Sequence, residues 1–356
     1  MLLWLSKQYA GLAVLHYLTM RSIVAALIAM VGSMVCGPWV IRRLVAHQIG
    51  QMVRSNGPQA HLAKSGTPTM GGMLIIVMVL LAVLLCADLG NGYIWLLTTS
   101  MLGFGAIGFL DDYLKIARGN SVGLSSKRKF MLQLLVAATV AWLLWRGVKT
   151  PEETILIVPF FKNVGWQLSW LFPIWTVLVV TGSSNAVNLT DGLDGLVIMP
   201  LVMIMAALGV FCYLSGHVEF ANYLFIPYVA RVAEVAVFCS SIVGAGLGFL
   251  WFNTYPAQIF MGDVGSLGLG AVMGLIAVMV RQELVLVIMA GVMVAETLSV
   301  ILQVGSYRLF GRRVFKMAPL HHHFELSGWP EPRIIVRFWI ITCVLVLCGL
   351  ATLKIR

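Results

Sequence analysis

The sequence has 356 residues, of which 60% are hydrophobic and only 11% charged, and its mean hydropathy is +0.94. A soluble domain is usually about 25% charged, so these values exclude a water-soluble globular protein and predict an all-α, polytopic integral membrane protein. The formal charge of +10 does not indicate nucleic-acid binding, because the basic residues lie at the ends of apolar segments. There they set membrane topology or meet anionic ligands.

The chain begins with an apolar stretch, residues 1–20, that has no charged region before its apolar core and no small-residue cleavage site. We expect a retained interfacial helix here and not a signal peptide. No later polar block is long enough for a separate soluble domain, which predicts a single transmembrane domain over residues 1–356. The six cysteines form no CxxC pair, so they indicate packing residues and not a zinc or disulfide framework.

A membrane-spanning helix needs roughly 20 apolar residues. About ten candidates follow along the chain, several of them short or interrupted by glycine: 22–41, 71–89, 93–110, 130–146, 170–187, 195–215, 235–252, 264–280, 284–305 and 334–352. If successive loops face alternate sides, fifteen of the 24 Lys and Arg residues fall in one set of loops. Positive residues accumulate on the cytoplasmic side, which predicts that this set is cytoplasmic and that both termini are periplasmic.

The stretch KSGTPTMGG (64–72) joins the first two spans and carries Lys64, Thr67 and Thr69 beside flexible glycines. The Walker A pattern GxxxxGK[ST] is absent, so this is not a phosphate loop of that type. On local grounds, a loop that leads into a helix explains the stretch better than a binding site does.

The stretch GFLDDYLK (108–115) ends the third span with two adjacent carboxylates, Asp111 and Asp112. Adjacent carboxylates repel each other unless a cation or a lysine compensates them, and Lys115 is close enough on a helix to serve both. Two interpretations stand: a solvated helix end with an ion pair, or a magnesium or phosphate site. Neighbours on a helix point about 100° apart, so the two carboxylates should not face the same atom unless the helix is broken.

The stretch NAVNLTDGLDGL (185–196) places Asn185, Asn188, Asp191 and Asp194 at intervals of three. If the stretch is helical, these residues form one polar stripe, which must face protein or a water-filled cavity and not lipid. A helix cap followed by a turn is the alternative, because Asn, Asp and Gly are common in both.

The stretch FNTYPAQIFMGDVGSLGLG (252–270) contains Asn253, Phe260, Asp263 and Ser266 at the start of another span. Asp263 fits an N-cap that faces the positive end of the helix dipole. A carboxylate in that position can also bind a cation, so the two interpretations are compatible.

The stretch MAPLHHHFE (317–325) carries three consecutive histidines in a basic loop. A zinc site would need spaced ligands with further cysteine or histidine partners, which the stretch does not supply. Histidines beside arginines and a lysine suit pyrophosphate binding better, and an ordinary solvated loop is the alternative. With the predicted topology, this loop and the acidic motifs all fall on the cytoplasmic face.

These five motifs, in this order and over nearly the whole chain, resemble those of the polyprenyl-phosphate N-acetylhexosamine-1-phosphate transferases. The HHHFE loop resembles the phospho-N-acetylmuramoyl-pentapeptide branch and not the N-acetylglucosamine branch. The resemblance implies transfer of phospho-N-acetylmuramoyl-pentapeptide from its UDP derivative to undecaprenyl phosphate, which gives lipid I and UMP in peptidoglycan synthesis, with Mg²⁺ as cofactor. It also implies ten spans, periplasmic termini, an active site on the cytoplasmic side of the bacterial inner membrane, and a homodimer.

The resemblance also implies roles for particular residues. Asp263 is the expected magnesium ligand, while Asp111 and Asp112 are the expected acidic pair at the reacting phosphates, with Asp111 as candidate base. Asp194, Asn253 and Phe260 are expected to form the uridine pocket, with Phe260 stacked on the base. His321, also expected to be catalytic, and His322 are expected to hold pyrophosphate or sugar. The rest of the polar cleft would be lined by Lys64, Thr69, Lys115, Lys127, Asn188, Asp191 and Ser266.

Two other functions compete with this one. The first is the same chemistry with UDP-N-acetylglucosamine as the nucleotide sugar. The second is a transporter, because carboxylates within the membrane and broken helices are also typical of transporters. The gathering of five acids on one face, and not at the middle of the membrane, favours the enzyme.

Overall fold

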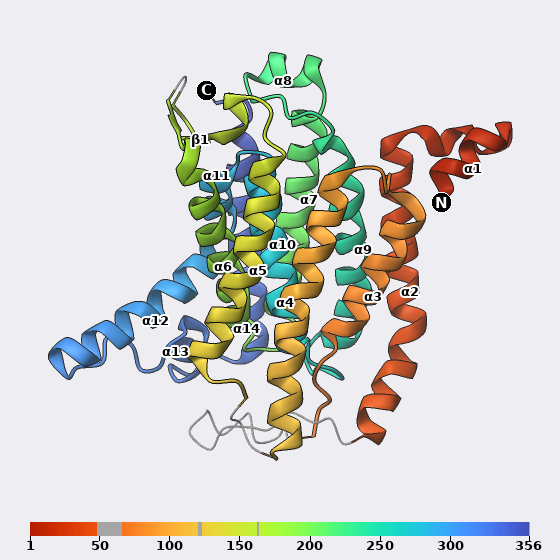
Figure 1. Ribbon diagram of the computed structural model, residues 1–356. Helices are drawn as coiled ribbons and strands as arrows, with labels where there is room; N and C mark the ends of the chain where they lie inside the picture. The colour runs from red at the N-terminus through yellow and green to blue at the C-terminus, as the bar shows by residue number, and fades with distance from the viewer. Residues whose placement is uncertain (48–65, 120–122, 162–163, 356) are drawn as a thin grey trace.

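The computed structural model describes residues 1–47, 66–119, 123–161 and 164–355. They form a helical bundle with one short antiparallel hairpin, β1 (Ile155–Ile157) and β2 (Gly165–Gln167) (Figure 1). The α-helices are α1 (Leu2–Gln8), α2 (Leu18–Ala46), α3 (Gly72–Cys86), α4 (Gly92–Ala117), α5 (Ser126–Arg146), α6 (Phe172–Thr190), α7 (Ile198–Ser215), α8 (Val218–Leu224), α9 (Val235–Asn253), α10 (Gly262–Met279), α11 (Glu283–Met289), α12 (Gly291–Phe310), α13 (Leu320–Glu325) and α14 (Glu331–Ala351). Short 3₁₀ helices are η1 (Ala10–His16), η3 (Pro151–Thr154), η4 (Ser169–Leu171) and η5 (Val232–Glu234).

All ten predicted stretches contain helix, which confirms an all-α polytopic membrane protein, but they are not ten equal spans. Within the described residues, eight helices are long and apolar enough to cross a membrane. The stretch 284–305 is a ninth only if α11 and α12 count as one span, and these helices meet at 84°. The stretch 71–89 holds α3, whose 15 residues extend about 23 Å against a hydrocarbon core of about 30 Å.

The N-terminal stretch forms two short helices, α1 and η1, that project sideways from the end of α2 (Figure 1). Figure 1 places them and the C-terminus toward one end of the bundle and α13 toward the other. The side of the membrane that each end faces, and the interfacial position of residues 1–20, stay predictions from the charge distribution and the apolar pattern.

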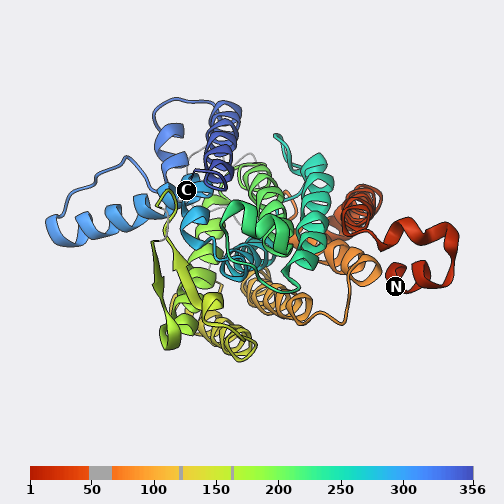
Figure 2. The ribbon, with the colours of Figure 1, turned by 90° about the horizontal axis from the view of Figure 1, so that it is seen from above.

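The centre of the bundle is α10, which is buried along nearly its whole length and surrounded by other helices (Figure 2). Its sequence, GDVGSLGLGAVMGLIAVM, is rich in glycine. A Cβ atom on Gly270 would lie 2.8 Å from the carbonyl oxygen of Ser183 in α6, and one on Gly268 would lie 3.1 Å from that of Met101 in α4. Small residues allow such close packing where lipid provides no hydrophobic driving force between helices. This packing brings α4 and α6 against the first turn of α10.

A buried ion pair joins three elements at the end of the bundle opposite α13. The guanidinium of Arg21 in α2 pairs with both carboxylate oxygens of Glu234 in η5, with 3.0 Å between Nη2 and Oε2, and donates to the carbonyl of Cys86 at 3.1 Å. The backbone N–H of Asp88 donates to Glu234 at 2.7 Å. These contacts pair two charges that are almost fully removed from solvent.

We expect Arg21→Met to destabilise the protein by about 3–5 kcal/mol, because it leaves the carboxylate of Glu234 buried without its cation. The double variant Arg21→Met/Glu234→Met should recover part of this loss, since neither charge is then left unpaired. Denaturation of the protein in detergent measures both effects. As a control, Arg231→Met, which removes an exposed pair with Asp88, should cost less than about 1 kcal/mol. A double variant as unstable as Arg21→Met would contradict the prediction.

Candidate active site

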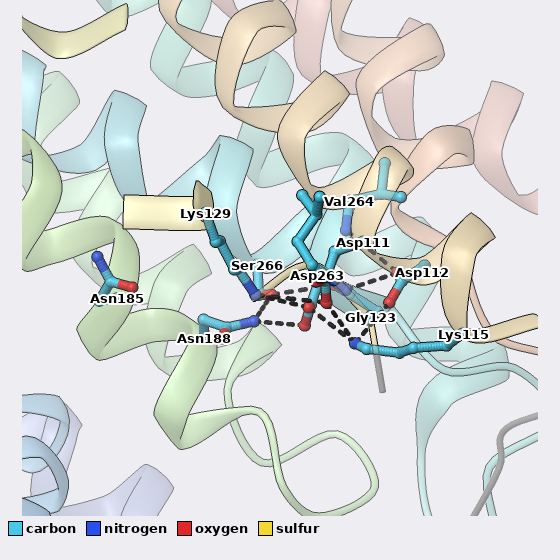
Figure 3. Close-up of polar contacts among 12 residues, drawn as sticks. Asp111, Asp112, Lys115, Gly123, Lys129, Asn185, Asn188, Asp263, Val264 and Ser266 are labelled. Carbon is cyan, nitrogen blue, oxygen red and sulfur yellow. Dashed lines mark hydrogen bonds and ion pairs between the residues drawn. The ribbon is translucent and has the colours of Figure 1, made fainter. Parts of the chain in front are cut away.

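Three carboxylates from two helices form an acidic centre. Asp111 and Asp112 lie near the end of α4, and Asp263 lies in the first turn of α10. One oxygen from each carboxylate lies within 4.8 Å of the other two, and Asp111 and Asp112 are buried (Figure 3). The prediction that the two adjacent carboxylates cannot face the same atom unless the helix is broken is wrong, because the Nζ atom of Lys115 contacts both although α4 runs unbroken to Ala117.

Glycine allows the two helices to meet at this point. A Cβ atom on Gly108 in α4 would lie 2.1 Å from the carbonyl oxygen of Asp263. The carboxylate of Asp112 accepts the backbone N–H groups of Asp263 at 2.8 Å and Val264 at 3.4 Å. Asp112 therefore caps the N-terminus of α10, where the helix dipole also favours its charge, so the cap interpretation of Asp263 does not hold. The side chain of Asp263 is left to contact other residues.

Two lysines balance the acidic centre. The Nζ atom of Lys115 lies 2.7 Å from Asp111, 3.2 Å from Asp112 and 2.9 Å from Asp263, which confirms that one lysine serves both members of the acidic pair. The Nζ atom of Lys129 lies 2.7 Å from Asp263 and 3.6 Å from Asp111. Sequence reasoning selected Lys127 for this region, but the side chain of Lys127 is exposed.

Lys129 was missed although the sequence contains a signal for it. It lies four residues before Gln133, which is polar and buried on α5. Residues four apart share one face of a helix, so Lys129 begins the polar side of α5 that faces the bundle. Lys127 is two residues away, on another face of the same helix.

Only part of the polar stripe predicted in NAVNLTDGLDGL lies on a helix. Asn188 donates to Asp263 at 2.7 Å and to the hydroxyl of Ser266 at 2.8 Å, so α6 contributes to the acidic centre (Figure 3). Because α6 ends at Thr190, Asp191 and Asp194 lie beyond it, where the alternative of a cap and a turn holds.

Asp194 and Asn253 fix the loop that precedes α10. Asp194 accepts the backbone N–H of Ala257 at 2.9 Å, and the side-chain amide of Asn253 donates to the carbonyl of Ile259 at 2.7 Å. The backbone of Phe260 bonds on both sides to the segment that contains Thr69: its N–H donates to Pro68 and its carbonyl accepts from Gly71, each at 2.8 Å. A Cβ atom on Gly262 would lie 2.9 Å from the hydroxyl oxygen of Thr69. Lys64, which precedes this segment, lies outside the described residues.

The first histidine of the triplet is buried between two other elements. The Nδ1 atom of His321 lies 3.3 Å from a carboxylate oxygen of Glu296 in α12, and its backbone N–H donates to the same oxygen at 3.1 Å. A Cβ atom on Gly192 would lie 2.2 Å from the Nε2 atom of His321, so only glycine fits there. His322 lies 2.7 Å from Glu325. Sequence reasoning missed Glu296, whose signal is an acid in the middle of an apolar stretch.

The acidic centre fits a hard divalent cation. Mg²⁺ prefers oxygen ligands, and the three carboxylates supply them from two rigid helices. Two lysines against three carboxylates leave one formal negative charge, which favours a cation in addition to the lysines. Asp111, Asp112 and Asp263 are the residues that would hold it.

The carboxyl of Asp191 makes the folding stability of the cation-free protein depend on pH. Burial of its carboxyl and the nearby carboxylates of Asp263, Asp112 and Asp194 raise the pKa of Asp191 to about 8. The folded protein therefore holds a proton on Asp191 that the unfolded chain releases near pH 4. Because the folded state binds the extra proton between these two values, its stability falls as the pH rises from about 4 to 8.

We expect Asp191→Asn to gain stability relative to the wild type as the pH rises, because the amide cannot ionise. The difference should grow by about 1–3 kcal/mol between pH 5 and pH 8, and should change little above that range. Melting temperatures of both proteins in detergent with EDTA, across this range, measure it. A difference that stays constant with pH would show that Asp191 is ionised throughout.

The comparison with protein families agrees with this geometry. The family described as Glycosyl transferase family 4 matches residues 93–281, which is more than half of the chain. The matched region holds the acidic centre, both lysines and Asn188. Members of this family act on nucleotide sugars and polyprenyl phosphates. The chain therefore belongs to Glycosyl transferase family 4, the polyprenyl-phosphate N-acetylhexosamine-1-phosphate transferases.

Proposed function

We propose that this enzyme transfers phospho-N-acetylmuramoyl-pentapeptide from UDP-N-acetylmuramoyl-pentapeptide to undecaprenyl phosphate and produces lipid I and UMP. The observation that carries the proposal is the position of the HHHFE loop. His321 packs against Gly192 in the motif that also supplies Asn188 to the acidic centre. The loop that resembles the muramoyl-pentapeptide branch thus packs against a segment that lines the site, where it can contact the sugar. We place the site on the cytoplasmic side of a bacterial inner membrane, in a single catalytic domain that forms a homodimer.

The reaction exchanges one phosphoanhydride bond for another. An oxygen of the lipid phosphate attacks the phosphorus attached to the sugar, and the bond from that phosphorus to the bridging oxygen breaks. UMP leaves with the bridging oxygen, so no proton is required once the lipid phosphate is ionised. Catalysis of such a transfer rests on positioning and on charge stabilisation. When bound at the three carboxylates, Mg²⁺ would neutralise phosphate charge.

The side chains of the protein supply the remaining charge stabilisation and the contacts that position the substrates. Lys115 and Lys129 place two cations at the reacting phosphates, and Asn188 holds the carboxylate of Asp263 in one orientation. We assign Asp111 as the candidate base for any lipid phosphate that is still protonated. Asp194 and Asn253 shape the loop that carries Phe260, and we propose that the Phe260 ring stacks on uracil. We assign the sugar or pyrophosphate to His321 and His322.

The proposal is tested by supplying the purified protein with undecaprenyl phosphate, Mg²⁺ and one of two nucleotide sugars. UMP release and lipid I formation with UDP-N-acetylmuramoyl-pentapeptide, and not with UDP-N-acetylglucosamine, are the expected result. The opposite preference would assign the chain to the N-acetylglucosamine branch. Uptake of a labelled nucleotide sugar into vesicles without covalent transfer would instead support the transporter alternative, which the family membership disfavours.

We expect Phe260→Ala to raise the KM for the nucleotide sugar about 5- to 100-fold, because stacking of a base on an aromatic ring contributes about 1–3 kcal/mol. The KM for undecaprenyl phosphate should not change. Steady-state kinetics with each substrate varied in turn measures both values. The control is Phe109→Ala, which removes an aromatic ring that stacks on Tyr113 on the outer side of α4. If Phe260→Ala leaves the nucleotide KM unchanged, Phe260 is not part of the uridine pocket.

A further inference from the structure

An amide pair connects α5 and α6 one turn away from the acidic centre. The side-chain amide of Asn185 donates to the carbonyl oxygen of Gln133 at 2.8 Å, and that of Gln133 donates back at 3.5 Å. Asn185 also donates to the backbone carbonyl of Thr181 at 2.8 Å. Gln133 is 1% exposed, so loss of its partner would leave a buried amide without a hydrogen bond. Gln133 and Asn185 are called the amide clasp below.

The amide clasp lies next to two residues that contact the two carboxylate oxygens of Asp263. Lys129 is four residues before Gln133 on α5, and Asn188 is three residues after Asn185 on α6, so each pair shares a helix face. Lys129 lies 2.7 Å from one oxygen of Asp263, and Asn188 donates to the other oxygen at 2.7 Å. Figure 3 shows Asn185 one turn along α6 from Asn188, with Asn188 and Lys129 converging on Asp263.

Apart from the amide clasp, the buried side chains of α5 are apolar within the described residues. They are Ala137, Val140, Ala141 and Leu144. Apolar packing limits where α5 can lie, as Val136 against Gly103 of α4 shows, but a hydrogen bond between side chains also has a defined length and direction. The amide clasp is thus the directional contact nearest to Lys129 on this helix. A shift of about 1 Å in a group at a reacting centre can cost about 10²-fold in rate.

We propose that the amide clasp is a positioning device for catalysis: Gln133 and Asn185 set the register of α5 against α6 and thereby hold Lys129 and Asn188 on Asp263. In this proposal the two residues of the amide clasp act through Lys129 and Asn188 and not by contact with a substrate. The inference rests on the proposed function only in that Lys129 and Asn188 act at the reacting phosphates. A general stabilising role predicts a different result, in which stability falls and the kinetic parameters of the folded protein stay unchanged.

The test exchanges the lengths of the two side chains. Gln133→Asn shortens one side of the amide clasp and Asn185→Gln lengthens the other, while the double variant restores the combined length. We expect each single variant to lower kcat about 10- to 100-fold, while the KM for the nucleotide sugar stays within about threefold of the wild-type value. The double variant should have a kcat at least about tenfold higher than the slower single variant. The control is Thr139→Val on the exposed side of α5, where the hydroxyl donates only to Leu135 of its own helix.

A second measurement does not depend on activity. The ammonium of Lys129 is largely buried against Asp263, whereas Lys127 on the same helix is exposed. Labelling with an amine-reactive reagent, followed by mass spectrometry, should therefore show slow modification of Lys129 in the wild type. Faster modification is expected in each single variant, slow modification again in the double variant, and constant modification of Lys127 in all of them.

The proposal is overturned if the single variants keep the wild-type kcat and the slow labelling of Lys129. It is also overturned if the double variant is as slow as the worse single variant. Failure of the proposed substrate assignment is distinguishable from these outcomes. A wild type that prefers UDP-N-acetylglucosamine changes the substrate of the assay, but leaves the labelling of Lys129 as the measure of the amide clasp.

Discussion

Replacement of Asp263 by asparagine is expected to lower kcat by about 10³-fold or more while the protein still folds. Asp263 meets both lysines, lies within 4.8 Å of the other two carboxylates, and accepts a hydrogen bond from Asn188. Asparagine has the same size, but it removes the charge that a divalent cation requires. The cap of α10 survives, because Asp112 provides it. The rate of lipid I formation at saturating substrates measures the loss.

Two further measurements separate loss of the cation from loss of the fold. Titration with Mn²⁺, followed by its paramagnetic resonance, should show weaker binding to Asp263→Asn than to the wild type. The melting temperature should stay within a few degrees of the wild-type value. Asp88→Asn is a matched control, since it removes an exposed carboxylate in the connection between α3 and α4 and should leave the rate unchanged. Near-normal activity of Asp263→Asn at limiting Mg²⁺ would remove Asp263 from the site.

Replacement of Lys129 by methionine is expected to lower kcat about 10²- to 10³-fold, the usual cost of one preorganised group that stabilises charge in a transition state. Its ammonium lies 2.7 Å from Asp263 and 3.6 Å from Asp111. Methionine retains most of the side chain's length and apolar character, so the loss reports the charge. Steady-state rates at saturating concentrations of both substrates measure the effect.

The matched control is Lys127→Met, two residues away on the same helix. The side chain of Lys127 is exposed, so we expect a change of less than about threefold in kcat. This comparison decides whether the exposed Lys127 or the largely buried Lys129 acts at the acidic centre. If Lys127→Met is the slow variant and Lys129→Met is not, α5 is rotated in the working enzyme relative to this structure.

The sequence was sufficient to predict which segments of the chain are helices in lipid. A chain with 60% hydrophobic residues must place its helices in lipid, and each of the ten predicted stretches contains helix. The lengths were less predictable. Residues 71–89 and 284–305 are apolar enough to span, but α3 has 15 residues and α11 meets α12 at 84°. Hydropathy measures the preference of a segment for lipid and not the direction in which its helix runs.

The acidic residues of the site were also accessible to sequence reasoning, because carboxylates in apolar surroundings require a partner. Asp111, Asp112 and Asp263 come together as those motifs indicated, and Lys115 serves the adjacent pair. The residue that caps α10 could not be predicted from the sequence. A cap contributed by the same chain segment leaves a local pattern, whereas Asp112 reaches α10 from a helix 151 residues earlier.

The sequence by itself therefore determined the class of protein, the approximate extent of its helices and the chemical types of residue at the site. Only the tertiary structure decided which basic and acidic partners face those residues. The choice of Lys129 over Lys127 depends on the rotation of α5 about its own axis, and the pairing of Glu296 with His321 depends on the bend before α12. Rotation and bending follow from packing between segments that are distant in the chain, which local sequence patterns do not encode. The close approach of Gly108 in α4 to the backbone carbonyl of Asp263 in α10 is an example of such packing.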